Sequence, residues 1–275
     1  MITLASDFGT PYPAAMKGVL CQRTDAKLVD VSHEFPRQDV RAAAFWLRET
    51  LPYFPPAVHL VVVDPGVGTD RDALVVRAGE HALVGPDNGV LVPVARRLAG
   101  EEGFDTFVID ESRLDPPEQP TTGDSVTGHA ADSAGPASNT FHGRDVFAPA
   151  AGDVHEAGVD SLTSLAFLEP TSEFVEQELP TATVEGDRAT GEVLVVDDFG
   201  NAITNVPGRF LDGQTRIGVD GDTVPVGDTF AAVSVGERLA TVGSHGYVEL
   251  DVNQGRGDEA FGLSVGDRIV LDRSE

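Results

Sequence analysis

The apolar segments of this chain follow two different patterns, one before residue 170 and another after residue 180. In the first part, strand-like runs such as 2–6 and 58–64 alternate with stretches of helical periodicity such as 39–54 and 90–100. Apolar residues that recur at the period of a helix or of a strand indicate which face each element buries. Alternation of strands and helices predicts an α/β domain with a mainly parallel central sheet. Further strand-like runs occupy residues 27–32, 73–78 and 106–110.

Residues 180–275 consist of short strand-like runs separated by Gly and Asp. Turn signals that recur about every 8 to 12 residues are typical of an all-β sandwich or barrel. We therefore predict an α/β domain over residues 1–170 and an antiparallel β-barrel domain over residues 180–275. Residues 115–139 are rich in Pro, Gly, Ser, Thr and Asp, which predicts a polar loop inserted into the first domain.

The charge of the chain excludes several classes of function. Asp and Glu number 45 against 19 Lys and Arg, which gives a formal net charge of −26. Such a chain repels nucleic-acid backbones and anionic lipid, and the excess of acid is typical of proteins that work at high salt. The sequence contains no apolar stretch of the roughly 20 residues that span a bilayer and no signal-peptide pattern at its start. We expect a cytoplasmic protein. The single Cys21 excludes an internal disulfide and a cysteine cluster for zinc.

Three segments share one pattern, an apolar strand that ends in Asp and is followed by glycine. Asp7, Asp64 and Asp197 occupy this place in LASDFG, VVVDPGVG and VVDDFGN. Ligands bind at the carboxyl ends of strands in open α/β sheets, so these aspartates are candidates for a shared pocket. Each Asp could instead only initiate a turn, which Asp does readily. The occurrence of three such segments favours a site.

Two further polar segments could contribute to a site, and the absence of several known motifs excludes some classes of enzyme. GPDNG at 85–89 is an ordinary turn signal. TFHGRDVF places His142 and Arg144 between apolar residues, where a structural and a functional histidine are equally compatible with the pattern. Asp7, Asp64 and His142 could bind a divalent metal, although no HExxH or similar spacing supports this. The sequence has no P-loop, no GxGxxG that opens a helix and no GxSxG.

Taken together, the motifs resemble those of one enzyme family. ITLASDFG, MKGVL, VVDPGVGT, GPDNGVL, TFHGRDVFAPAA, DDFGNAITN and GSHGYVELDVNQG occur in this order over nearly the whole chain. They resemble the S-adenosyl-L-methionine hydroxide adenosyltransferases, which are relatives of the fluorinase and chlorinase. The resemblance implies an N-terminal α/β domain, a C-terminal β-barrel and a homotrimer with the ligand between neighbouring subunits. It implies no metal and no organic cofactor, and the acidic composition suggests a halophilic archaeon as the source.

The resemblance also implies which residues form the site. Asp64, Arg71 and His142 match the residues that act on water in this family. Asp7 would hold the ribose hydroxyls, Phe199 and Phe230 would flank the adenine, and Asp197 and Ser244 would face the methionine moiety. The remaining implied substrate-binding residues are Asn201 and the backbone near Gln254 for the adenine, together with Asn88 and Tyr247.

The implied activity is hydrolysis of S-adenosyl-L-methionine to adenosine and L-methionine. Three alternatives stay open at this point: transfer of the adenosyl group to chloride or another halide, binding of a nucleoside without turnover, and metal-dependent hydrolysis. The presence of Asp64, Arg71 and His142 favours water over halide. Asp198, His245 and the 115–139 insertion depart from the family pattern, and the first two could alter affinity for the amino-acid end of the substrate.

Overall fold

The computed structural model describes residues 1–117 and 140–273. The chain forms two compact units, Met1–Glu178 and Leu179–Glu275, and each is described by itself. Of the expected polar loop at 115–139, residues 118–139 lie outside the described part of the chain.

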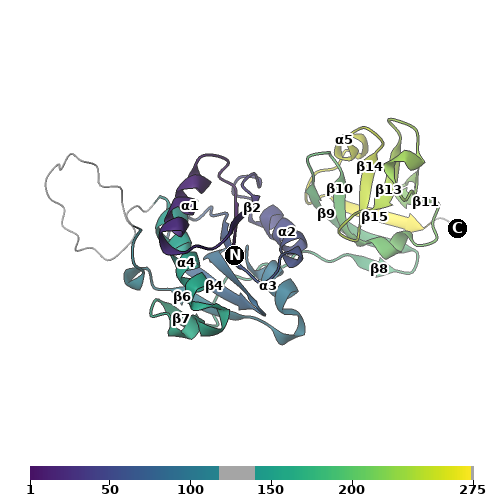
Figure 1. Ribbon diagram of the computed structural model, residues 1–275. Coiled ribbons are helices and arrows are strands. Elements are labelled where there is room, and N and C mark those ends of the chain that lie inside the picture. The colour runs from purple at the N-terminus through teal and green to yellow at the C-terminus, as the bar shows by residue number, and fades with distance from the viewer. Residues whose placement is uncertain (118–139, 274–275) are drawn as a thin grey trace. The chain divides into compact units, whose positions relative to one another are not determined.

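The first unit contains a sheet of seven strands (Figure 1). Their order is β2-β1-β3-β5-β4-β6-β7, in which β2, β1, β3 and β5 are parallel neighbours. The pairs β5–β4, β4–β6 and β6–β7 are antiparallel. The carboxyl ends of β1, β3 and β5 therefore meet at one edge of the sheet, where β4 begins. The strands are β1 (Ile2–Ser6), β2 (Leu28–Ser32), β3 (Val58–Val62), β4 (Ala73–Ala78), β5 (His81–Pro86), β6 (Asp105–Ile109) and β7 (Leu168–Thr171).

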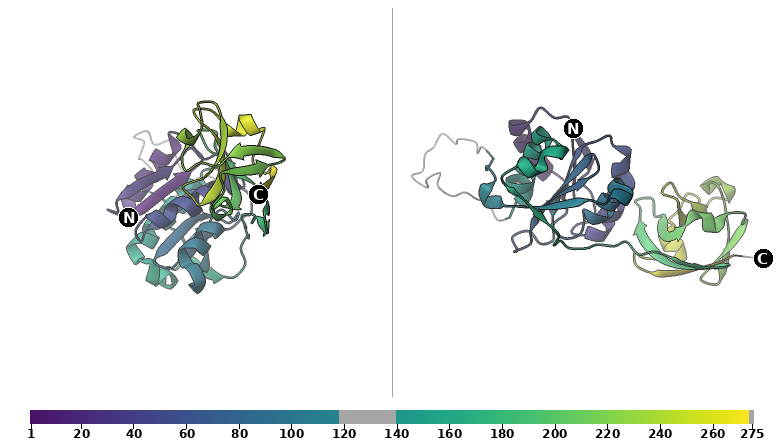
Figure 2. Two further views of the ribbon diagram at one scale, coloured as in Figure 1. Left: turned by 90° about the vertical axis from the view of Figure 1, so that its right-hand side faces the viewer. Right: turned by 90° about the horizontal axis from the view of Figure 1, so that it is seen from below.

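Helices cover both faces of this sheet (Figures 1 and 2). One core contains Leu4 and Leu60 with residues of α1 and α4, and the other contains Val61 and Val63 with residues of α2 and α3. Full burial of a Leu or Val side chain contributes about 1.5 to 3 kcal/mol. The helices are α1 (Tyr12–Arg23), α2 (Val40–Thr50), α3 (Val92–Ala99) and α4 (Ala148–Ala157).

The expected α2 and α3 are present, whereas α1 and β5 were not predicted from the sequence. Asp39 caps α2, because its carboxylate accepts a hydrogen bond from the Ala42 backbone N–H at 2.9 Å. Shorter turns of 3-10 helix span Leu51–Tyr53, Gly100–Glu102, Glu111–Arg113, Val159–Ser164, Gly208–Leu211 and Phe230–Ala232. A π-helical turn spans Gly143–Phe147.

The second unit is an antiparallel sheet with the strand order β12-β11-β15-β9-β10-β14-β13, and β8 pairs with β9. An isolated bridge between Val226 and Ala240 joins the two ends, so the sheet nearly closes into a barrel around a core that includes Val193, Val248 and Leu250. The elements are β8 (Thr183–Glu185), β9 (Arg188–Val196), β10 (Ala202–Pro207), β11 (Arg216–Val219), β12 (Asp222–Pro225), β13 (Arg238–Val242), β14 (Tyr247–Val252), α5 (Gly257–Phe261) and β15 (Arg268–Arg273).

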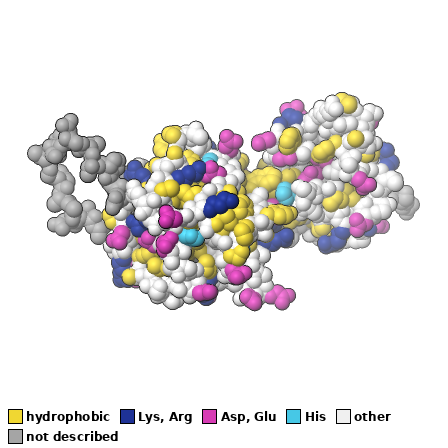
Figure 3. Space-filling model, viewed as in Figure 1, with side chains coloured by type: hydrophobic (Ala, Val, Ile, Leu, Met, Phe, Trp, Pro, Cys, Tyr) yellow, Lys and Arg dark blue, Asp and Glu magenta, His cyan; other side chains and the backbone are white. Residues whose placement is uncertain are grey.

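The predicted fold class, an α/β domain followed by a β-barrel, is confirmed. Acidic side chains are distributed over the visible face of both units (Figure 3). In residues 1–117 and 140–273, none of the helices combines the length and the apolar character that crossing a bilayer requires.

Candidate active site

The loops that follow β1, β3 and β5 bring the predicted residues of the first unit to one edge of the sheet. Asp7 follows β1, Asp64 follows β3 and Asn88 follows β5. Arg71 lies just before β4, and β4 runs antiparallel to β5 with Ala73 opposite Pro86. Four residues that are separate in the sequence therefore share the edge at which α/β proteins bind ligands.

Asp64, Arg71 and His142 form a hydrogen-bonded set. The Arg71 Nε donates to Asp64 Oδ1 at 2.8 Å, and the Arg71 Nη2 donates to Asp64 Oδ2. The same Nη2 lies 3.0 Å from His142 Nδ1. The side chains of Arg71 and Asp64 are 9% and 3% exposed, and His142 is 7% exposed. The two parallel contacts hold the carboxylate and guanidinium in one plane, and their burial shields the pair from solvent.

This geometry sets the proton positions on His142. A guanidinium nitrogen can only donate, so His142 Nδ1 must accept the hydrogen bond from Arg71. The imidazole is therefore neutral, and its hydrogen lies on Nε2. This assignment follows from the donor and acceptor roles of the partners. His142 thus offers one N–H for a further contact.

Close packing explains the glycine after His142. His142 precedes the π-helical turn Gly143–Phe147, which continues into α4. A Cβ on Gly143 would lie 2.9 Å from Met16 Sδ and 3.3 Å from the Phe8 ring. A larger residue at this position would displace these side chains, so Gly143 allows the turn after His142 to pack closely against α1. The Phe147 ring lies 5.0 Å from the Arg71 Cζ and packs against its guanidinium.

Asp7 is held by a different loop. Its Oδ2 accepts a hydrogen bond from the Gln38 backbone N–H at 2.7 Å, and the residue is 8% exposed. Gln38 has a φ of 60°, a left-handed conformation that non-glycine residues rarely adopt. Gln38 was not identified from the sequence, because a backbone donor leaves no signature in the side-chain pattern. Asp7 shares the sheet edge with the Asp64, Arg71 and His142 set.

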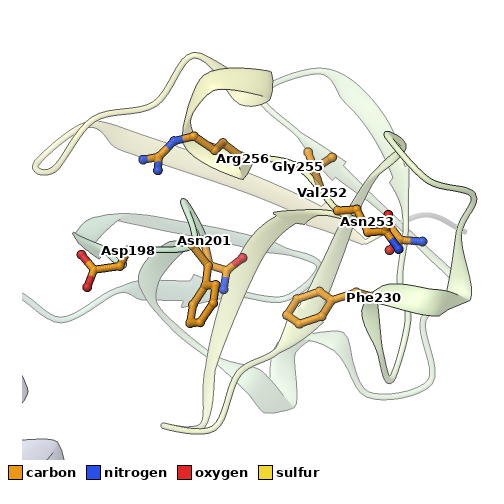
Figure 4. A pocket seen from close by; sticks show the side chains of 9 residues that line it. Asp198, Asn201, Phe230, Val252, Asn253, Gly255 and Arg256 are labelled. Carbon is orange, nitrogen blue, oxygen red and sulfur yellow. The ribbon is translucent and has the colours of Figure 1, made fainter.

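The second unit contains a pocket of about 660 Å³ beside the turn between β9 and β10 (Figure 4). Four of the predicted substrate residues line it: Phe199, Asn201, Phe230 and Gln254. Phe199 is 80% exposed and Phe230 is 45% exposed, which is unusual for phenylalanine and is typical of a binding surface. The other lining residues are Asp198, Val252, Asn253, Gly255 and Arg256, of which only Asp198 was noted from the sequence.

Asp197 does not line this pocket, but it holds two of the lining residues in place. Its Oδ1 accepts hydrogen bonds from the backbone N–H groups of Phe199 and Asn201 at 3.0 and 2.9 Å. Its Oδ2 accepts from the Asn201 side-chain amide at 3.0 Å. The turn and the orientation of the amide are thereby fixed together. Ser244 and Tyr247 are not among the residues that line the pocket.

Two buried acids on β14 were not anticipated from the sequence. Glu249 is 7% exposed and Asp251 is fully buried, with Oδ2 accepting from the Thr241 hydroxyl at 2.6 Å and Oδ1 without a partner. Burial and the neighbouring Asp251 carboxylate raise the pKa of Glu249 to about 7. Burial also raises the pKa of Asp251 to about 6, against the hydrogen bond from Thr241.

The alternation YVELDV predicts that Val248, Leu250 and Val252 face the core and that the acids face outward. The outward face is nevertheless covered, and α5 packs against β14. In the described part of the chain, His, Cys, Asp and Glu residues do not gather in groups of three or more that could hold a metal ion.

Comparison with known proteins identifies the family of this chain. The sequence profile of the SAM hydroxide adenosyltransferase N-terminal domain matches residues 2–165, and that of the SAM hydroxide adenosyltransferase C-terminal domain matches residues 191–270. The two profiles match the two units of the chain in order. The chain belongs to the SAM hydroxide adenosyltransferase family.

Curated relatives carry a more specific name. A protein of Thermus thermophilus is 42% identical over 274 residues, and the match covers 97% of each chain. A protein of Salinispora tropica is 37% identical over 98% of this chain and 96% of its own. Both relatives are named (R)-S-adenosyl-L-methionine hydrolase.

Two solved structures have the same fold as this chain. A conserved protein of Thermotoga maritima, described as uncharacterized, is 31% identical, with a TM-score of 0.79 over 99% of this chain and 100% of its own. A conserved hypothetical protein of Thermus thermophilus is 36% identical, with a TM-score of 0.70 over 99% of each chain.

Proposed function

We propose that this protein hydrolyses S-adenosyl-L-methionine to adenosine and L-methionine. The observation that carries the proposal is the buried, hydrogen-bonded set of Asp64, Arg71 and His142. This set occurs in a chain that is 42% identical to a protein named (R)-S-adenosyl-L-methionine hydrolase. Because that name specifies the (R) epimer at sulfur, we propose the (R) epimer as the substrate.

The reaction needs a well-placed nucleophile more than it needs an acid. The oxygen of water forms a bond to C5′ of the ribose, and the C5′–S bond breaks with both electrons going to sulfur. The sulfonium becomes the neutral thioether of methionine, so the leaving group needs no proton. The water loses one proton, and the products are adenosine, L-methionine and that proton. Orientation of the water can lower such a barrier by several kcal/mol.

The three side chains have separate roles in this proposal. The Arg71 guanidinium stays protonated in a folded protein and cannot act as a base, so it fixes the Asp64 carboxylate. The His142 Nε2–H donates a hydrogen bond to the water and orients its lone pair towards C5′. The Asp64 carboxylate accepts the proton that the water loses as the C–O bond forms.

The remaining predicted residues would bind the substrate. Exposed aromatic rings and an oriented amide suit a planar base, so Phe199, Phe230 and Asn201 would hold the adenine together with the backbone at Gln254. A fixed carboxylate suits a pair of hydroxyls, so Asp7 would hold the ribose. Asn88, Asp197, Ser244 and Tyr247 remain proposed contacts to the substrate or to the residues around it.

We propose a homotrimer in which the substrate lies between the N-terminal domain of one subunit and the C-terminal domain of its neighbour. Two features support an assembly: the charged set and the aromatic pocket lie in different units of the chain, and Phe199 is 80% exposed. We further propose a cytoplasmic location in a salt-accumulating cell, which the net charge of −26 supports.

Product analysis in ¹⁸O-labelled water tests the activity. The purified chain is incubated with each epimer of S-adenosyl-L-methionine in high chloride, with and without a chelator. We expect adenosine that carries ¹⁸O at its 5′ position, unaffected turnover in chelator and a preference for the (R) epimer. A chlorinated nucleoside would overturn the proposal in favour of halide transfer, and unchanged bound ligand would indicate a binding protein.

Mixing two variants with different defects, at a substrate concentration far below the KM of the second, tests the assembly. Asp64→Ala removes the proposed base, and Asn201→Ala together with Phe230→Ala removes the proposed adenine contacts. If the site combines domains of neighbouring subunits, mixed trimers regain sites with all residues intact, and activity returns on mixing. Light scattering should give the mass of three chains. A monomeric mass, or no recovery after subunit exchange, would contradict the trimer.

A further inference from the structure

The turn Gly85–Gly89 contacts both ends of the loop that carries Asp64 and Arg71. The Asn88 Nδ2 donates to the backbone carbonyl of Val63 at 2.9 Å, and Val63 directly precedes Asp64. The Asp87 backbone N–H donates to the carbonyl of Asp72 at 2.9 Å, and Asp72 directly follows Arg71. One turn therefore holds the two points at which the loop leaves β3 and enters β4.

The Asn88 amide can hold the Val63 carbonyl in only one orientation of its oxygen and nitrogen. Its Oδ1 accepts a hydrogen bond from the Val90 backbone N–H at 3.1 Å, while its Nδ2 donates to the Val63 carbonyl. Asparagine supplies both an acceptor and a donor on one short planar group. Aspartate would keep the acceptor but lose the donor, and an apolar residue would lose both. Gly85 allows β5 to approach β3, because a Cβ there would lie 2.4 Å from the Val61 carbonyl oxygen.

The second contact of the turn reaches the guanidinium itself. The Asp72 carbonyl that accepts from the Asp87 N–H also accepts from Arg71 Nη1, at 3.1 Å. Arg71 is thus held between this carbonyl and the Asp64 carboxylate. The position of the whole charged set therefore depends on the distance between β3 and the start of β4, which the turn spans.

We propose that Asn88 is a positioning residue, which sets the place of Asp64 by holding the Val63 carbonyl. This inference rests on the proposed function of the Asp64, Arg71 and His142 set. It gives Asn88 a role different from the contact with substrate that the family resemblance implies. A displacement of about 1 Å in a reacting group can cost about a hundredfold in rate, whereas substrate affinity need not change.

The test uses Asn88→Asp in the full chain. The aspartate carboxylate still accepts from the Val90 N–H but repels the Val63 carbonyl. We expect kcat at pH 8 to fall by about 10- to 100-fold, with KM and the Kd for adenosine within about threefold of the parent. As the pH is lowered the introduced carboxyl gains a proton and donates to the Val63 carbonyl again, so the loss in kcat shrinks. Asn88→Ala should lower kcat without this recovery.

Asn205→Asp is the matched control. Asn205, in the second unit, makes two contacts of the same kinds with other partners. Its Oδ1 accepts from the Glu192 backbone N–H at 2.9 Å, and its Nδ2 donates to the Pro180 backbone carbonyl at 3.1 Å. We expect this variant to retain the parental kcat and its pH profile. An equal loss of kcat in Asn205→Asp would overturn the assignment, because the effect would then be unspecific.

Hydrogen exchange separates this inference from the proposed function. Amides of residues 64–72 should exchange faster in Asn88→Asp than in the parent and in Asn205→Asp, whether or not the parent turns over the substrate. An Asn88→Asp chain with parental exchange and parental kcat at every pH would overturn the inference, as would a tenfold rise in KM at unchanged kcat. Absence of adenosine formation by the parent, with faster exchange in the variant, would overturn the proposed function alone.

Discussion

The N-terminal unit holds its charged side chains in a closed set of hydrogen bonds, whereas the C-terminal unit leaves its aromatic side chains open to solvent. Asp64 and Arg71 are paired and almost fully buried. Phe199 and Phe230, in contrast, are 80% and 45% exposed. The difference follows from the physics of the two kinds of group. Burial of a charge raises the free energy of the folded chain unless a partner is already in place. Covering an apolar ring with a ligand, in contrast, lowers the free energy.

This contrast predicts a division of labour in which the Asp64, Arg71 and His142 set determines kcat and the aromatic pocket of the second unit contributes mainly to KM. Removal of the carboxylate should give the largest effect. Asp64→Ala and Asp64→Asn should lower kcat by about a thousandfold or more, because both remove the proton acceptor and release Arg71. The Kd for adenosine should stay within about threefold, since that contact lies elsewhere. Asp70→Ala, at an exposed position in the same loop, should retain full activity. Single-turnover kinetics of each variant measure this; parental kcat in Asp64→Ala would exclude the role of Asp64.

Arg71→Lys tests whether geometry matters beyond charge. Lysine keeps the positive charge but cannot make both parallel contacts to Asp64 and the contact to His142. We expect kcat to fall by about 100-fold, with little change in KM. Arg77→Lys, which alters a half-exposed pair with Asp105, serves as the control and should leave kcat unchanged. Equal activity of the two variants would show that charge alone suffices.

Asn201→Ala tests the second unit. The change removes the amide that Asp197 orients towards the pocket, and a hydrogen bond of this kind is worth about 1 to 2 kcal/mol. KM should therefore rise by about 5- to 30-fold while kcat changes by less than about threefold. Steady-state kinetics over a wide range of substrate concentration separate the two constants. A fall in kcat at constant KM would contradict the division between the units.

Glu249→Gln should have the smallest effect on activity and a clear effect on stability. The pKa of Glu249 in the folded chain, about 7, lies above its ordinary value of 4.5. The protonated side chain therefore makes its full contribution to the free energy of unfolding below about pH 4.5. This contribution is lost as the pH rises through 7, a change on the order of 3 kcal/mol. The glutamine variant should be more stable than the parent at pH 8 and should show a shallower dependence on pH.

Urea unfolding at pH 5 and pH 8, at one protein concentration, measures this difference. Glu185→Gln on β8 is an exposed control and should follow the parental pH dependence. A parental slope in Glu249→Gln would show that Glu249 ionises without a penalty in the folded chain.

Much of the fold follows from local pattern. The apolar runs at 2–6 and 73–78 coincide with β1 and β4, because a short apolar run is typical of a strand that is buried on both faces of a sheet. Helix α1 was not anticipated, because its buried residues, among them Met16 and Leu20, do not form a strong apolar stripe in the sequence. Its packing against α4 is a contact between distant parts of the chain.

The sequence by itself determined the two-domain class, and its resemblance to a family pointed to Asp64, Arg71 and His142, because both depend on patterns within short segments. Only the tertiary structure decided how these residues meet: which nitrogen of His142 accepts from Arg71, and that Asn88 holds the carbonyl before Asp64. It also buried Glu249 and Asp251 on a strand face that alternation assigns to solvent. Periodicity reports the orientation of a side chain relative to its own strand, whereas burial and hydrogen bonding depend on the elements that pack against it.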